Sequence, residues 1–97
     1  MFDKSLNIIF TKHANEQITK RDISQNEITN SIKNDNFIEI TKDNNIFKIC
    51  YKNTTNKDLI VVLREENKCL NIITSYKRYT KRRKKWVLLI MMKKMMF

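Results

Sequence analysis

The chain has 97 residues, which is enough for one domain and too few for two. It contains no glycine and no proline, so glycine-rich nucleotide-binding loops are excluded, and asparagine, aspartate and serine must form the turns. The formal net charge is +10, but residues 77–97 contribute +9 of it, with nine basic and no acidic residues.

This uneven charge divides the chain into a body at residues 1–76 and a C-terminal extension at residues 77–97. The extension is basic as far as Lys85 and then apolar from Trp86 to Met92, a run too short to cross a bilayer, which takes roughly 20 residues. We expect a helix whose apolar end packs on the sheet or on another protomer. The alternatives are an arm that binds nucleic acid and a segment that lies on an anionic membrane surface.

The first predicted elements are a short strand and a helix. The apolar run at residues 6–10 is a candidate extra strand, and residues 11–24 have the spacing of a helix with Ala14 and Ile18 turned to the core. The polar face of this helix carries residues three or four positions apart, namely His13, Gln17 and Lys20, with Arg21 beside Gln17.

A second helix is predicted to begin at Ser24, because Ser24 and Glu27 have the spacing of a capping box. Ile28 and Ile32 continue the apolar stripe that begins at Ile23. The Asn-Asp-Asn cluster at residues 34–36 ends the helix, since asparagine tolerates the left-handed conformation in place of glycine. The two helices are expected to form a compact hairpin.

Four strands are expected after the helices, because the apolar period changes to two residues. They lie at residues 37–41, 46–52, 59–64 and 69–76, separated by short polar turns, and the third is apolar enough to be central. The predicted fold is therefore α+β, with an N-terminal helical hairpin packed on a mainly antiparallel four-stranded sheet.

Several of these residues together resemble a known family. The features are the pair His13-Ala14, an arginine eight positions after the histidine, the pair Ile23-Ser24 before a capped helix, and the run Ile72 to Tyr76. Together they resemble the pattern of a small domain-of-unknown-function family of archaea, bacteria and their viruses. Gln17 stands where the pattern usually has an arginine. Members of the family resemble the RelE-like and BrnT-like ribonuclease toxins in size and in having helices packed on an antiparallel sheet.

The resemblance implies a toxin-like, metal-independent endoribonuclease, or a degenerate relative that binds RNA. Histidine suits the proton-transfer steps of RNA cleavage because its unperturbed pKa lies near working pH, and arginine suits the phosphorane charge. His13 is therefore the candidate acid–base residue, with Arg21 as the electrostatic stabiliser. The candidate RNA-binding residues are Lys12, Lys20, Arg64, Tyr76 and Lys77. The implied partners are single-stranded or ribosome-presented RNA and a cognate antitoxin.

Plainer interpretations of the same residues stay open. His13 could be a helix cap or a surface residue, and Arg21 could pair with a carboxylate, for example Glu16, Asp22 or Glu39. Tyr76 could be a half-buried sheet residue rather than a stacking platform. The alternative function is a non-catalytic module that binds nucleic acid or protein.

The two cysteines, Cys50 and Cys69, lie in apolar strand patterns and are expected to be reduced core residues rather than a disulfide. With one histidine and two isolated cysteines, the chain lacks the paired ligand spacing of a zinc site, and no cofactor is expected. The N-terminal residues do not have the pattern of a secretion leader, which predicts a cytoplasmic protein.

Overall fold

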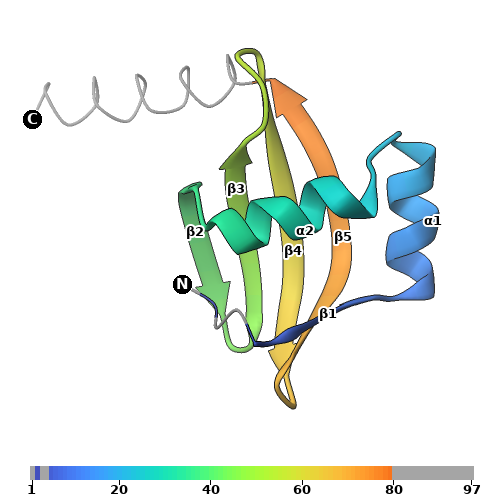
Figure 1. The fold of residues 1–97 in the computed structure, drawn as a ribbon, viewed down its shortest axis with the longest axis vertical. Coiled ribbons are helices and arrows are strands. Elements are labelled where there is room, and N and C mark those ends of the chain that lie inside the picture. Colours follow the sequence, from blue (N-terminus) through green and yellow to red (C-terminus); the bar gives the residue numbers. More distant parts are fainter. Residues whose placement is uncertain (1, 3–4, 80–97) are drawn as a thin grey trace, which may run out of the picture.

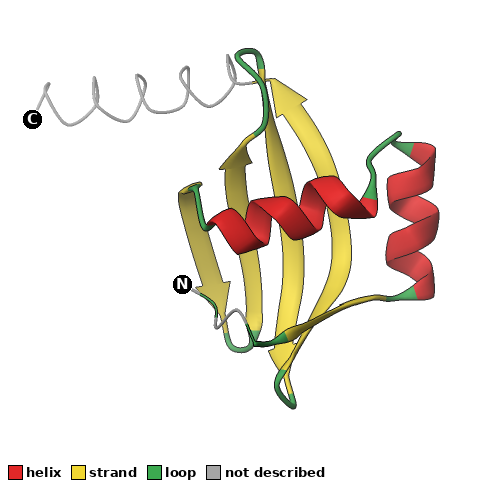
Figure 2. Cartoon of the chain, viewed as in Figure 1, coloured by secondary structure: helices red, strands yellow, loops and turns green. Residues whose placement is uncertain are grey.

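The computed structural model describes residues 2 and 5–79, and the chain forms two helices and one five-stranded sheet in this part (Figures 1 and 2). Across the sheet the strands follow the order β1-β5-β4-β3-β2. In chain order the elements are β1 (Asn7–Phe10), α1 (Lys12–Lys20), α2 (Gln25–Asn34), β2 (Phe37–Asp43), β3 (Ile46–Lys52), β4 (Lys57–Glu66) and β5 (Cys69–Tyr79).

The prediction of a helical hairpin on a four-stranded antiparallel sheet is wrong. The candidate strand at residues 6–10 is a true fifth strand, β1, and it pairs in parallel with β5, from Asn7 opposite Cys69 to Phe10 opposite Ile72. The other three pairings are antiparallel. The sheet is therefore mixed.

The helices form a crossover between two sheet edges instead of a hairpin. Because β1 lies at one edge and β2 at the other, the chain must cross the sheet between them. Helix α2 makes this crossing over one face, while α1 lies alongside β5 (Figure 1). The 10 residues of α2 span about 15 Å. This length is close to the three strand spacings of about 4.8 Å that separate β5 from β2.

The helix ends are set by local chemistry. Thr11 caps α1 and Ser24 caps α2, each accepting a hydrogen bond from a backbone N–H three residues later, at Ala14 and Glu27. Helix α2 ends where Asp35 takes the left-handed conformation, with φ of 54°. An aspartate therefore takes the left-handed position that glycine usually occupies at a helix end, whereas the sequence pattern predicts an asparagine there.

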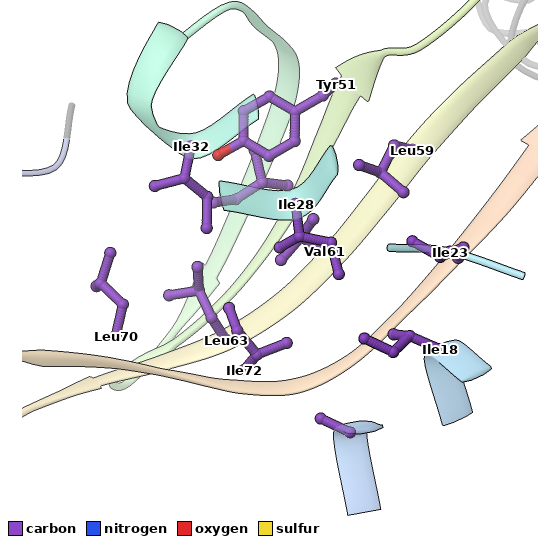
Figure 3. Close-up of a cluster of buried hydrophobic side chains, with 12 residues drawn as sticks. Ile18, Ile23, Ile28, Ile32, Tyr51, Leu59, Val61, Leu63, Leu70 and Ile72 are labelled. Carbon is purple, nitrogen blue, oxygen red and sulfur yellow. The ribbon is translucent and has the colours of Figure 1, made fainter. Parts of the chain in front are cut away.

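One apolar cluster lies between the helices and one face of the sheet (Figure 3). The predicted helix positions are confirmed as buried: Ala14, Ile18, Ile23, Ile28 and Ile32 are all at most 5% exposed. The strands contribute alternate residues, namely Ile49, Tyr51, Leu59, Val61, Leu63, Leu70 and Ile72. Since both helices bury their apolar stripes in this one cluster, neither of them covers the opposite face, which we call the open face.

Strand β5 continues through Tyr79, so Lys77 and Arg78 belong to the sheet. The rest of the predicted basic and apolar extension, residues 80–97, lies outside the described residues, as do residues 1, 3 and 4.

Candidate functional site

Helix α1 is attached to β5 at its N-terminal end. The hydroxyl of Thr11, which caps the helix, also donates a hydrogen bond of 3.1 Å to the carbonyl oxygen of Ile72. His13 therefore lies in the first helical turn, just beyond the end of β1, and its side chain is exposed. Of the two plainer roles considered for His13, helix cap and surface residue, the structure shows the second, because Thr11 caps the helix and His13 is exposed.

Arg21 joins the other end of α1 to β5. Its Nη1 donates hydrogen bonds of 3.0 Å to Thr74 Oγ1 and 2.9 Å to the carbonyl oxygen of Ser75. The Ser75 carbonyl is available because β1 pairs with β5 only as far as Ile72, which leaves the next part of β5 without a neighbouring strand on that side. Arg21 thus occupies the place of the missing strand.

The Arg21 guanidinium also lies over an aromatic ring. Its Cζ atom is 5.9 Å from the centroid of the Tyr76 ring, within the range of a cation–π contact. Tyr76 is half-buried, and Arg21 itself is exposed. Of the residues considered from sequence, Arg21 and Tyr76 are the pair that the fold brings into contact.

His13 and Arg21 lie at opposite ends of α1. They are eight positions apart, which corresponds to about 12 Å along the helix axis. The carboxylates considered as partners for Arg21 make no ion pair with it within residues 5–79, since its hydrogen bonds go to β5. Glu39 pairs with Arg78 instead, at 3.6 Å.

The remaining candidate residues are distributed over three surfaces. Lys12 and Lys20 are exposed on α1, near His13 and Arg21 respectively. Arg64 is exposed on β4, where it pairs in register with Ile46. Lys77 faces the helices, and its Nζ lies 3.2 Å from Glu27 Oε2 in the first turn of α2. Lys77 is therefore already engaged in an ion pair.

A hollow on the open face was not predicted from the sequence. It is lined by residues from four strands, namely Glu39, Thr41, Lys48, Cys50, Ile60 and Arg78. Two-residue alternation within β2 and β3 could have grouped some of these residues on one face. Their neighbours across the sheet could not be assigned without the strand order and register.

The thiol of Cys50 at the floor of this hollow is buried, only 4% exposed. Burial raises the pKa of the Cys50 thiol, and the nearby Asp58 carboxylate raises this pKa further, against a smaller opposing effect of Arg78. The Arg78 Nη2 atom lies 3.6 Å from Cys50 Sγ. Both cysteines are free, as expected from the sequence.

We expect Cys50 to react with iodoacetamide more slowly than Cys69 in the folded protein between pH 7 and 9. A raised pKa lowers the thiolate fraction at any given pH, and burial limits access, whereas Cys69 is partly exposed. Mass spectrometry of tryptic peptides over time measures both rates. The two rates should become similar in denaturant. Faster labelling of Cys50 than of Cys69 in the folded chain would contradict the burial of this thiol.

Within residues 2 and 5–79, no three or more histidine, cysteine, aspartate or glutamate side chains are placed to hold a metal ion. None of the described helices is long and apolar enough to cross a membrane.

The fold and the Arg21–Tyr76 contact define a small α+β domain with a cationic, aromatic surface beside an open sheet face. Residues 10–77 match the model of a family of domains of unknown function, DUF4258, and the chain belongs to this family. No curated protein and no solved structure matches the chain.

Proposed function

We propose that this domain binds single-stranded RNA at the surface formed by α1 and the exposed part of β5, and that it is a relative of the RelE-like and BrnT-like ribonuclease toxins. The observation that carries the proposal is the position of the Arg21 guanidinium over the Tyr76 ring, at the edge of the sheet face that neither described helix covers. We call this pair the Arg21–Tyr76 platform.

The platform has unused binding capacity. A guanidinium has five N–H donors, and the two hydrogen bonds of Arg21 to β5 use only those of Nη1. Its remaining donors suit a phosphate oxygen, since arginine binds phosphate in a planar, bidentate manner. An aromatic ring next to a fixed cation is the usual arrangement for stacking an unpaired base.

The charges on α1 extend this surface toward the start of the helix. Lys20 precedes Arg21, and Lys12 lies beside His13, with both lysine side chains exposed. An RNA backbone running along α1 would meet cations at both ends of the helix. Phosphate contacts of this kind add affinity without base specificity.

Metal-independent cleavage is the second candidate function, and the exposure of His13 beside Lys12 supports it. Because His13 and Arg21 are about 12 Å apart along the axis, His13 would act on a phosphate different from the one that Arg21 holds. On this proposal Arg21 positions the strand and His13 transfers the proton. A cognate antitoxin would act by covering this surface.

RNA binding by point variants tests the platform. We expect Arg21→Ala and Tyr76→Ala each to weaken binding of a single-stranded RNA by about 10- to 100-fold, since a charged hydrogen bond or a base stack contributes roughly 1–3 kcal/mol. Fluorescence anisotropy with the full chain at two salt concentrations measures this. Arg21→Ala should also lower the salt slope by about 0.7.

Matched controls remove similar groups elsewhere. Tyr79→Ala removes an exposed tyrosine that contacts Lys57 rather than Arg21, and Lys33→Ala removes an exposed charge at the end of α2. Both controls should bind RNA like the unmodified chain. Equal weakening by control and test variants would mean that binding comes from net charge, and the platform would have no role. Thermal unfolding of each variant excludes loss of structure as the cause.

A further inference from the structure

We infer that the hollow on the open face binds the Watson–Crick edge of an unpaired guanine base. The inference rests on the proposed RNA-binding function and names the base that the domain recognises. It depends on one row of residues across the sheet and on two opposite charges at its end.

The hollow and the Tyr76 ring of the platform lie on the same face of the sheet. The strand register places Glu39 opposite Cys50, Cys50 opposite Ile60, and Ile60 opposite Tyr76. Residues directly opposite each other in antiparallel strands share a face and are neighbours. An RNA strand with one base stacked at Tyr76 can therefore present the edge of an adjacent base to the hollow.

The floor of the hollow is closed to solvent, so a base can approach it only by its edge. Ile60 is 1% exposed and Cys50 is 4% exposed, and neither belongs to the apolar cluster beneath the helices. The raised pKa keeps the Cys50 thiol uncharged at neutral pH. The charged groups that line the hollow, and that the edge of a base can meet, are those of Glu39, Lys48 and Arg78.

The sides of the hollow provide both hydrogen-bond acceptors and donors. The Glu39 carboxylate and the Arg78 guanidinium are 3.6 Å apart, and the Glu39 side chain is 61% exposed. The Arg78 Nε atom is buried and has no hydrogen-bond acceptor within the described residues. Lys48 adds a second cation to the lining. Because the Glu39 side chain is mostly exposed and the pair is long, the ion pair contributes little to stability, so the Glu39 carboxylate can turn to a ligand.

Guanine is the base whose edge fits these groups. A carboxylate can accept two parallel hydrogen bonds only from two adjacent donors, and among the four RNA bases the N1–H and N2–H₂ groups of guanine supply them. The neighbouring O6 and N7 atoms of guanine are acceptors, which arginine and lysine bind. Adenine, cytosine and uracil each place an acceptor where Glu39 needs its second donor.

Nucleotide titration followed by NMR tests this inference. Guanosine monophosphate added to the ¹⁵N-labelled full chain should shift the amide signals of Glu39, Thr41, Cys50 and Ile60. Inosine monophosphate lacks only the 2-amino group and should bind about tenfold more weakly or worse, because one charged hydrogen bond is lost. Adenosine, cytidine and uridine monophosphates should show no preference for the hollow.

Variants connect the preference to the carboxylate. Glu39→Gln should remove the discrimination between guanosine and inosine monophosphates, because the glutamine side chain has one acceptor and a donor group in place of two acceptors. The matched control Glu66→Gln changes an exposed glutamate at the end of β4 and should keep the discrimination. An unchanged preference in Glu39→Gln, or shifts by guanosine monophosphate away from the hollow, would overturn the inference.

A guanine-free oligouridine separates this inference from the proposed function. If the oligouridine binds in an Arg21-dependent manner and guanosine monophosphate does not bind the hollow, the guanine site is wrong and the platform stands. If guanosine monophosphate binds the hollow and Arg21→Ala leaves oligouridine binding unchanged, the guanine site stands and the platform is wrong.

Discussion

Replacing His13 with alanine is expected, on the proposed cleavage function, to lower the rate of RNA cleavage in the presence of chelator by about 10²- to 10⁴-fold, the usual contribution of a general acid–base group. Because the His13 side chain is exposed and Thr11 rather than His13 caps α1, the substitution should leave folding and RNA affinity nearly unchanged. Single-turnover cleavage of a labelled RNA with excess protein measures the chemical step separately from binding.

Arg21→Ala supplies the contrasting result in the same assay. Its guanidinium contacts β5 and Tyr76 at the other end of α1, so its loss should weaken RNA binding and lower the rate mainly at subsaturating protein. The matched control Lys33→Ala should cleave normally. Equal single-turnover rates for the unmodified chain and His13→Ala would remove His13 from the reaction and leave a domain that binds RNA without cutting it.

Replacing Ile28 with alanine is expected to lower the free energy of unfolding by about 2–5 kcal/mol, the range for truncating a buried isoleucine. Ile28 is fully buried at the centre of α2, between this helix and the sheet (Figure 3). Alanine favours helix formation more than isoleucine does, so the loss comes from packing and not from helix propensity. The total free energy of unfolding of a small domain is only a few times larger, so this loss is a large part of it.

Urea denaturation followed by circular dichroism measures this change. The matched control is Ile38→Ala in β2, where the isoleucine is 43% exposed, and its cost should stay below about 1 kcal/mol. A cost for Ile28→Ala no larger than that of the control would contradict the position of α2 on the sheet. Both variants lie away from His13 and Arg21, so cleavage and binding below the unfolding transition should stay unchanged.

The starts and the buried stripes of both helices were predictable from local patterns, whereas the first helix was expected to run to residue 24 and ends at Lys20. Ser24 with Glu27 marks the start of α2, and isoleucines at residues 18, 23, 28 and 32 mark the buried stripe, because capping and helical periodicity depend on neighbours within one or two turns. The bounds of β3 and the starts of β2 and β5 were predicted for the same reason, since alternation within a strand is a local property.

The candidate site was less predictable. Arg21 and Tyr76 were both named from the sequence, but their contact depends on β1 stopping at Ile72 and leaving the Ser75 carbonyl free. The hollow lined by Glu39 and Arg78 brings together residues from the second and fifth strands. No local spacing predicts that pair, because the two residues are 39 positions apart along the chain.

Composition, capping residues and apolar periods were sufficient to identify an α+β fold, its buried helix positions and half of the strand limits, since each of these depends on interactions between near neighbours in the chain. The parallel pairing of β1 with β5, the crossing of α2 and the assembly of the open face were decided only by tertiary structure. Strand order is chosen by how the whole apolar surface is buried at once, and pairings between distant segments carry no mark in the sequence of either segment alone.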